Sequence, residues 1–411
     1  MPSLVLALVL VVVWTYLVAM TVGAFRFARR PIERPAAQPA LSVLKPLHGA
    51  EPGLYENLCS FADQDYRELQ LVLGVRDQDD SALPIARRLI EARPHRDIAL
   101  VIDPRVAGSN LKVANLENML PKARHGVLVL ADSDVRVEPH YLAAVTAPLQ
   151  DPRTGLMTCL YKAAPTGGVW SLLGAMHINF SFLPNALLGE AIGTGGGCFG
   201  ATIALRREVL ERIGGFTRLR NELADDHRMG AAVRALGLSV VLSPYIVENR
   251  VSEPDFGSLW RHELRWARTS RAMAPAGFAD SVVTHTVVLA ALAAIASGFS
   301  AAASTGLLVS LLLRWASAGF IARRIGLPTN GFWLLPLRDA LSFAVFVGSF
   351  CGRSVLWRDQ LFRLEPGGRL TVGETSRYDE DPVPGMKPGG RYRRSMRPRA
   401  TRRRFEVTAR R

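Results

Sequence analysis

Two aspartates, Asp132 and Asp134, directly follow the apolar part of V-L-V-L-A-D-S-D-V-R-V, which spans Val127 to Val137. A continuous apolar run of this kind predicts a strand buried on both faces of a parallel sheet. Ligands of such sheets bind beyond the carboxyl ends of the strands. Two carboxylates one residue apart point the same way on an extended chain, so they can share Mg²⁺ or Mn²⁺ beside a nucleotide diphosphate. A polar turn after a strand has the same spacing, and the rest of the chain has to decide between the two.

Two more acidic clusters occur, at Asp77 to Asp80 and at Asp225-Asp226. The first follows the apolar run Leu69 to Val75, so it terminates a second predicted strand at the same sheet edge. The second opens a predicted helix over Asn221 to Leu236, where the helix dipole favours acidic side chains for structural reasons alone. Three acidic clusters in one domain favour a functional site over three unrelated turns.

The segments that carry these residues alternate between strand and helix patterns, which predicts a parallel sheet wrapped by helices. The predicted strands are Leu41–Leu44, Leu69–Val75, Ile98–Ile102, Val127–Ala131, Ala201–Leu205 and Ser239–Val247. The predicted helices are Leu54–Asp63, Leu83–Arg93, Pro139–Leu149, Arg207–Ile213 and Asn221–Leu236, and a loop from Gly108 to Leu120 leads into another helix that carries Lys112.

Two further segments carry residue types suited to ligands. The Gly-rich loop Gly193 to Gly200 lacks the Walker A pattern, so we expect either close backbone approach to a ligand or a plain flexible turn. Phe256 to Ala274 contains W-R-H-E-L-R-W and predicts an Arg- and Trp-rich amphipathic helix that suits a membrane interface or phosphate. Val169 to Leu188 is apolar without being long enough to span, and it predicts an interfacial or substrate-covering helix.

Long apolar stretches predict a membrane protein. Ser3 to Phe25 is 23 residues without a charge, and Arg26 follows at once, which places the amino terminus outside and the rest in the cytosol. Ser281 to Ala322 is 42 residues with one charge, Arg314, and predicts a two-helix hairpin. Leu341 to Cys351 is too short to span, and Arg338 and Asp339 precede it, so we expect a re-entrant or interfacial segment and a cytosolic tail.

The net charge of +14 is concentrated at the carboxyl terminus. Lys387 to Arg411 holds eleven Lys or Arg and one Glu, so the remaining chain is close to balanced. Such a tail predicts disorder, and nucleic-acid binding is at most a property of this tail, for which anionic lipid head groups are an equally good partner. The four cysteines are scattered and predict free thiols in a reducing compartment. The expected organisation is a membrane helix over 1–26, a catalytic domain over 40–255, an interfacial helix over 256–278, membrane segments over 281–357 and a basic tail over 376–411.

Taken in order, these motifs resemble the ceramide glucosyltransferase family, membrane-bound GT-A glycosyltransferases of family 21 that include hopanoid-biosynthesis enzymes. The resemblance covers about residues 41 to 270. The matching pieces are V-L-K-P-L-H-G (Val43 to Gly49), D-Q-D-D (Asp77 to Asp80), G-S-N-L-K-V-A-N-L (Gly108 to Leu116), A-D-S-D, A-D-D (Ala224 to Asp226) and H-E-L-R-W (His262 to Trp266). The resemblance implies an α/β GT-A, Rossmann-like domain with flanking membrane helices, a UDP-sugar donor and a lipid acceptor.

The same resemblance implies roles for particular residues. Asp80, with Asp77 beside it, falls on the family's first Asp, near the uridine, and Asp132 falls on the second, at the metal and diphosphate. Asp226 falls on the third, the general base. Three residues fall on the family's Q/R-x-x-R-W motif, and the first of them departs from its usual Gln or Arg: His262, Arg265 and Trp266. A metal ligand at Asp134 is inferred from the spacing alone, and Lys112 is expected to help Arg265 stabilise the leaving diphosphate.

The expected reaction is inverting transfer of a hexose to a lipid hydroxyl, with ceramide and UDP-glucose as the first expectation. A hopanoid acceptor with UDP-N-acetylglucosamine is the alternative, because the Arg- and Ala-rich composition favours a bacterial inner-membrane protein. A non-catalytic membrane scaffold is a more distant alternative, since such a protein would lack one or more of the three acids. The expected cofactor is Mg²⁺ or Mn²⁺, and the catalytic domain is expected in the cytosol.

Overall fold

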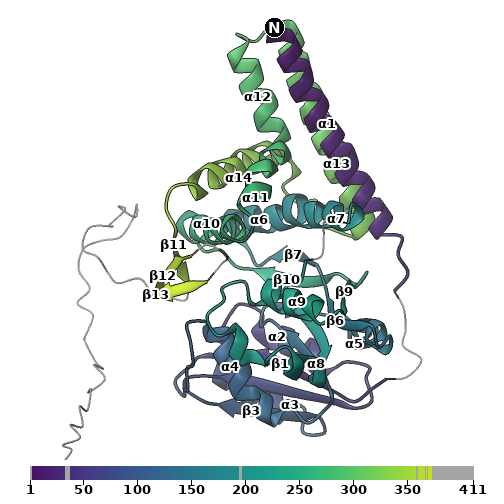
Figure 1. The fold of residues 1–411 in the computed structure, drawn as a ribbon, viewed down its shortest axis with the longest axis vertical. Coiled ribbons are helices and arrows are strands. Elements are labelled where there is room, and N and C mark those ends of the chain that lie inside the picture. Colours follow the sequence, from purple (N-terminus) through teal and green to yellow (C-terminus); the bar gives the residue numbers. More distant parts are fainter. Residues whose placement is uncertain are drawn as a thin grey trace, which may run out of the picture. The chain divides into compact units, whose positions relative to one another are not determined.

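A seven-stranded mixed sheet forms the centre of the fold (Figure 1). The computed structural model describes residues 2–32, 38–193, 197–357, 360–365, 367 and 369–372, so the predicted basic tail lies outside the described residues. The order is β3-β2-β1-β4-β8-β6-β9. Its strands are β1 (Leu41–Pro46), β2 (Leu69–Val75), β3 (Asp97–Ile102), β4 (Val127–Ala131), β6 (Thr154–Thr158), β8 (Thr202–Arg206) and β9 (Ser239–Leu242).

The half of the sheet formed by β3, β2, β1 and β4 is parallel, as predicted, and the other half is mixed, because β6 and β9 pair in parallel while β8 is antiparallel to its neighbours. β1 pairs in parallel with β2 and β4, and β2 pairs in parallel with β3. β8 runs antiparallel to both β4 and β6. The parallel arrangement predicted from the β-α-β-α-β alternation is confirmed for β1 to β4. The antiparallel direction of β8 was not predicted, because strand direction depends on pairing between distant segments that the local pattern does not encode. The β-α-β-α-β part and the α/β class are confirmed.

Helices cover both faces of this sheet. Alternate residues of each central strand face opposite sides, so Val129 packs on one side while Leu128 and Leu130 pack on the other. One face is covered by α2 (Leu54–Ala62), α3 (Ala82–Ala92) and α5 (Tyr141–Thr146). The other face is covered by α4 (Leu111–Met119), α8 (Arg207–Arg212) and α9 (Asp225–Ala235).

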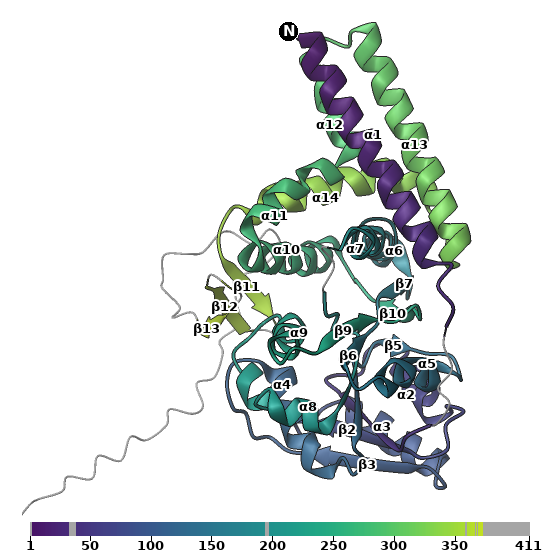
Figure 2. The same ribbon diagram turned by 45° about the vertical axis from the view of Figure 1, so that its right-hand side comes forward.

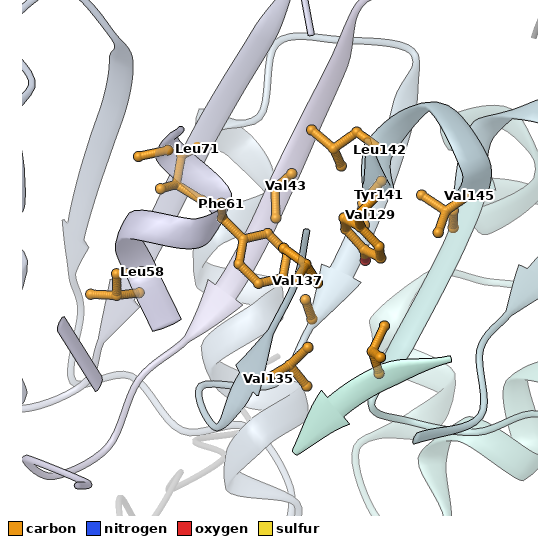
Figure 3. Close-up of a cluster of buried hydrophobic side chains, with 14 of the residues drawn as sticks. Val43, Leu58, Phe61, Leu71, Val129, Val135, Val137, Tyr141, Leu142 and Val145 are labelled. Atoms are coloured by element: carbon orange, nitrogen blue, oxygen red, sulfur yellow. The ribbon is translucent and has the colours of Figure 1, made fainter. Parts of the chain in front are cut away.

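Aromatic side chains fill the core beneath α2 and α5 (Figure 3). Phe61 and Tyr141 are fully buried, and their rings meet edge to face with centroids 5.4 Å apart. Val43 and Val129, from two adjacent parallel strands, lie in the same cluster. This packing fixes the positions of the strand ends from which the polar loops emerge.

A second sheet, β5-β10-β7, lies between the seven-stranded sheet and the helices beyond it (Figure 2). Its strands are β5 (Val135–Arg136), β7 (Tyr161–Pro165) and β10 (Val247–Val251). The predicted single strand over Ser239–Val247 is wrong, because Ser243-Pro244 separates β9 from β10 and the two strands belong to different sheets. The strands β6 and β7 were not predicted. A small third sheet holds β11 (Ser354–Trp357), β12 (Gln360–Leu364) and β13 (Leu370–Val372).

Beyond the second sheet lies a layer of helices, from which α1, α12 and α13 extend away from the sheet (Figure 2). The helices beyond the sheet are α1 (Pro2–Phe27), α6 (Gly168–His177), α7 (Leu183–Ala191), α10 (Phe256–Met273), α11 (Pro275–Asp280), α12 (Thr286–Ala296), α13 (Ala301–Ile325) and α14 (Leu335–Ser349). By length and composition, three segments of the described chain are able to cross a membrane: Leu6–Phe27, Ala301–Ile325 and Phe332–Ser349. A fourth span exists only if Pro275–Thr284 and Thr286–Ala296 count as one, and these are bent by 69°.

The predicted two-helix hairpin over Ser281 to Ala322 forms as α12 and α13, which pack against each other, but its first arm is shorter than expected. α12 has 11 residues, which is well short of the roughly 20 that a span needs. The sequence is apolar on both sides of the bend between Pro275–Thr284 and Thr286–Ala296, so the hydrophobic pattern does not reveal where the helix is interrupted. Within this stretch α13 is long enough to span by itself, whereas α12 reaches that length only together with Pro275–Thr284, and α1 packs against α13 along its length.

α14 begins earlier than predicted because its charges are paired. Arg338 is fully buried and forms a bidentate ion pair with Glu263 of α10, at 2.8 and 2.7 Å. Asp339 forms a bidentate pair with Arg314 of α13, at 2.9 Å for both contacts. In both views α14 is steeply inclined to α1 and α13 (Figures 1 and 2). An interfacial position for this segment stays a prediction.

We expect Arg338→Met to destabilise the protein strongly. Removing one partner of a buried ion pair leaves Glu263 as an uncompensated buried charge, which costs about 3–5 kcal/mol. Replacing both residues (Arg338→Met with Glu263→Leu) should restore most of that loss. Thermal unfolding of the detergent-purified protein measures the effect. The matched control is Arg93→Met, because Arg93 forms an equally bidentate pair with Asp63 at the surface. Equal melting temperatures for the Arg338 and Arg93 variants would contradict this assignment.

Candidate active site

The carboxyl ends of β1 and β4 open into a large cavity that reaches the apolar helices. Its volume is about 1470 Å³, and its lining extends from Asp132 after β4 to Tyr16 and Met20 of α1. Seven of the predicted site residues line it: Lys112, Asp132, Asp134, Asp226, His262, Arg265 and Trp266. The acidic clusters after β4 and at the start of α9 therefore share one site with the H-x-x-R-W motif of α10.

Lys112 forms the central ion pair of this site. Its Nζ lies 2.5 Å from Asp132 Oδ1 and donates to the carbonyl oxygen of Gly200 at 3.5 Å. Burial acts to lower the pKa of Lys112, but Asp132, Asp225 and Asp226 together outweigh it and raise the pKa above its usual value. The ammonium group therefore stays charged beside the carboxylates, where a leaving diphosphate needs a cation.

Asn110 fixes the start of the helix that carries Lys112. Its side-chain oxygen accepts hydrogen bonds from the backbone N–H groups of Lys112 and Val113, both at 3.0 Å, and so caps α4. Its amide nitrogen donates to the carbonyl of Glu222 at 2.7 Å and to Asp225 Oδ1 at 3.3 Å. One buried side chain thus holds α4 and the start of α9 together.

Asp134 is held in a buried position with one oxygen unused. Asn249 of β10 donates to Asp134 Oδ2 at 3.3 Å, and Oδ1 is buried without a hydrogen-bond partner. Burial, with Asp132 and Glu51 nearby, raises the pKa of Asp134 to about 8. A buried carboxylate oxygen without a partner is unfavourable unless a cation or a donor reaches it.

Lys45 lies beneath the two aspartates, and the sequence analysis did not assign it a role. This fully buried residue of β1 donates to the backbone carbonyl of Asp132 at 2.7 Å, and its ammonium group lies 3.7 Å from the ring centroid of Phe61. Burial lowers the pKa of Lys45 to about 7, although Asp134, Asp132 and Glu51 oppose it. A lysine inside a short apolar strand was the signal that could have identified it.

Asp226 is positioned by two backbone N–H groups. Gly200 donates to Oδ2 at 2.8 Å, and His227 donates to Oδ1 at 2.7 Å. A Cβ at Gly200 would lie 3.1 Å from Oδ2, so the Gly-rich loop approaches this carboxylate closely. Burial and the adjacent Asp225 raise the pKa of Asp226 to about 7, against the effect of both hydrogen bonds. A carboxylate with this pKa suits a general base near neutral pH.

The structure does not bring Asp77 and Asp80 into the lining of this cavity. Asp80 Oδ1 accepts hydrogen bonds from the backbone N–H groups of Gly49 and Ala82, both at 2.8 Å. Asp80 Oδ2 lies 3.2 Å from His48 Nδ1. Asp80 thus ties the loop after β1 to the start of α3. Its expected contact with the uridine stays a prediction.

The H-x-x-R-W motif lies on α10 and is anchored through Glu253. His262 Nδ1 is 2.7 Å from Glu253 Oε1, and Ser258 donates to Oε2 at 2.5 Å. Burial acts to raise the pKa of Glu253, but the hydrogen bonds from His262 and Ser258 outweigh it and lower the pKa. The Trp266 ring meets the His262 ring edge to face, with centroids 4.3 Å apart. His262 therefore orients Trp266, and both line the cavity with Arg265.

The carboxylates fit a divalent cation that is completed by substrate. Among the residues that the structure describes, no group of three or more His, Cys, Asp or Glu side chains is placed to hold a metal. Asp132 and Asp134 would supply two oxygen ligands, and the buried Asp134 Oδ1 without a partner fits that role. Mg²⁺ is commonly bound by one or two carboxylates together with substrate phosphates and water.

Comparisons with known proteins place the chain in a family. Residues 5–370 match the sequence profile described as Glycosyl transferase family 21. Ceramide glucosyltransferase 1 of Caenorhabditis elegans is 22% identical over 88% of this chain and 79% of its own length. Ceramide glucosyltransferase of Komagataella phaffii is 26% identical over 31% of this chain and 28% of its own length.

Among solved structures, a mannosyltransferase from Pyrobaculum calidifontis in complex with GDP-Man and Mn²⁺ matches with a TM-score of 0.48 and 19% identity, covering 84% of this chain and 99% of its own. The family profile, by contrast, spans most of the chain, including the cavity residues on α4, α9 and α10 and the apolar helices α1 and α13. The chain is therefore a sugar-transferring enzyme that belongs to glycosyl transferase family 21.

Proposed function

We propose that this glycosyltransferase moves a hexose from a UDP-sugar to a hydroxyl group of a membrane lipid, with ceramide as acceptor and UDP-glucose as donor. One observation carries the proposal: a single cavity holds the carboxylates, the lysine and the Arg-Trp motif and continues to the apolar helix α1. An acceptor with apolar chains can then reach Asp226 from the membrane side. The names of the curated relatives support ceramide as that acceptor.

In the proposed reaction, the acceptor oxygen bonds to the anomeric carbon of the sugar as the bond from that carbon to the diphosphate breaks. Asp226 takes the hydroxyl proton, and UDP leaves with the bonding electrons. Lys112 and Arg265 place positive charge where the diphosphate develops negative charge. A divalent cation at Asp132 and Asp134 would supply further charge stabilisation for the leaving group. No carboxylate acts as a nucleophile, so the configuration inverts.

We also propose that the catalytic domain faces the cytosol. Arg29 and Arg30 follow α1, and Arg323 and Arg324 end α13. The Arg324 guanidinium lies 5.1 Å from the ring centroid of Phe25, so the basic ends of the two helices are neighbours. Two parallel spans with adjacent basic ends satisfy the positive-inside rule on one side of the membrane.

The purified protein in lipid nanodiscs tests the acceptor and the donor. Four mixtures combine UDP-glucose or UDP-N-acetylglucosamine with ceramide or a hopanoid polyol, and released UDP is quantified beside mass spectrometry of the lipid. Glucosylated ceramide supports the proposal. A glycosylated hopanoid would replace ceramide as the proposed acceptor. The absence of UDP release in all four mixtures would contradict the proposed reaction for these donors and acceptors.

We expect Asp226→Asn to lower the turnover rate by about 10²–10⁴-fold, because the amide cannot take the hydroxyl proton. UDP affinity, measured by isothermal titration calorimetry, should stay near that of the wild type. The rate constant kcat/KM of the wild type should fall as the pH drops below about 7, because protonated Asp226 is inactive as a base.

The matched control for this variant is Asp225→Asn, which changes the neighbouring carboxylate in the same helical turn. Asp225 accepts from Asn110 rather than from Gly200, so its loss should disturb the start of α9 more than the chemistry. Normal turnover in Asp226→Asn, with loss of turnover in Asp225→Asn, would move the base to Asp225.

We expect activity to disappear in EDTA and to return on addition of Mg²⁺ or Mn²⁺, because Asp132 and Asp134 cluster negative charge where the diphosphate must bind. Asp134→Asn should weaken Mg²⁺ binding, so the Mg²⁺ concentration that gives the half-maximal rate should rise. Full activity in chelator would instead assign charge neutralisation to Lys112 and Arg265 alone.

A further inference from the structure

A buried ion pair lies in the membrane-side part of the active-site cavity. Arg314 of α13 and Asp339 of α14 pair through two contacts of 2.9 Å, and their side chains are only 8% and 10% exposed. Both residues line the cavity that also contains Asp226. Charged residues among apolar helices are costly, and where they persist they commonly mark a ligand pathway or binding site.

Two polar atoms at this place have no hydrogen-bond partner among the described residues. They are Arg314 Nη1 and the hydroxyl oxygen of Tyr16, and both are buried. Tyr16 belongs to α1, so the two atoms come from adjacent helices, and both residues line the cavity. Burying a donor without an acceptor is unfavourable, and native structures rarely leave such groups unless a ligand or water meets them.

The local backbone gives a second observation. Ile178–Phe182 is a π-helical turn between α6 and α7, and such turns occur frequently at functional sites. Arg314 Nη2 donates to the carbonyl oxygen of Phe180 in this turn at 3.1 Å. The guanidinium is thereby held by Asp339 and Phe180 in one orientation, and its remaining nitrogen is left for another partner.

We propose that Tyr16 and Arg314 bind an uncharged hydrogen-bonding group of the lipid acceptor, namely a hydroxyl or a carbonyl oxygen. The Arg314–Asp339 pair carries no net charge, so the pocket offers hydrogen-bond donors without attraction for an anionic head group. Leu17 and Met20 line the cavity beside Tyr16 and provide apolar surface for the attached chain. This inference rests on the proposed lipid acceptor, and it assigns a recognition point on the membrane side of the cavity.

Tyr16→Phe tests the inference because it removes only the hydroxyl, which makes no hydrogen bond in the structure. The full-length protein in nanodiscs is titrated with a short-chain ceramide in the absence of UDP-sugar, and the dissociation constant is measured. We expect about threefold to tenfold weaker binding, the size of one neutral hydrogen bond, with unchanged affinity for UDP. A double variant, Arg314→Met with Asp339→Leu, removes both charges together and should weaken binding further.

Thr21→Val is the matched control. Thr21 also lies on α1 and contacts α13, through Ser317 at 2.6 Å, but neither residue lines the cavity. Its ceramide affinity should equal that of the wild type. An unchanged affinity in Tyr16→Phe would overturn the inference and leave a bridging water as the partner of both atoms. Stronger binding of an anionic lipid of equal chain length would overturn the proposal that the site binds an uncharged group. The absence of saturable ceramide binding by the wild type would overturn it as well.

Sugar transfer separates this inference from the proposed function. Ceramide binding that depends on Tyr16, without hexose transfer, would contradict the proposed function and support the binding site. Hexose transfer to ceramide with the same acceptor KM in Tyr16→Phe and wild type would support the proposed function and overturn the binding site.

Discussion

The need to balance buried negative charge governs the active site. Asp132, Asp134, Asp225 and Asp226 line one cavity, and burial together with neighbouring carboxylates raises the pKa values of Asp134, Asp225 and Asp226. Two lysines compensate this negative charge. The partly buried Lys112 pairs with the Asp132 carboxylate, and the fully buried Lys45 donates to the backbone carbonyl of Asp132. One oxygen of Asp134 is buried without a hydrogen-bond partner, so it can accept from a donor or bind a cation. A divalent cation bound with a nucleotide diphosphate would meet that oxygen, so binding of the sugar donor would also change the charge balance of the site.

A few contacts of the fold position the charged side chains of the site. β1 and β4 are neighbours in the sheet, so Lys45 and Asp132 emerge side by side although they are far apart in the chain. Asn110 caps α4 and also binds the start of α9, which places Lys112 against the carboxylates. The Gly-rich loop then brings a backbone N–H to Asp226. Each contact depends on strand ends fixed by the packed core.

The predictions succeeded where the physical cause was local. Leu69–Val75 has the predicted bounds because a continuous apolar run is limited by charge at both ends. The thiols of the four cysteines are free, as predicted. β6 and β7 were missed because their residues mix threonine, glycine and alanine without a clear period. Lys45 was missed although it interrupts an apolar run, because that position in the sequence does not reveal its contacts with Asp132 and Phe61 in the folded chain. The start of α14 was missed for the same reason, since Arg338 and Asp339 read as a boundary until their partners are known.

Buried ion pairs also fix the apolar helices relative to the helix that carries the H-x-x-R-W motif. Glu263 sits inside the H-E-L-R-W motif and is held by Arg338 of α14, so the helix that presents Arg265 and Trp266 is fixed by a membrane-side residue. Such pairs add little stability over an apolar core, but they fix geometry, because any other arrangement would leave a charge buried alone. The same logic fixes Arg314 through Asp339. These pairs fix the apolar helices against the cavity that contains Asp226. In the proposed reaction, a lipid hydroxyl entering from the side of these helices would therefore meet a carboxylate whose position is already set by Gly200 and His227.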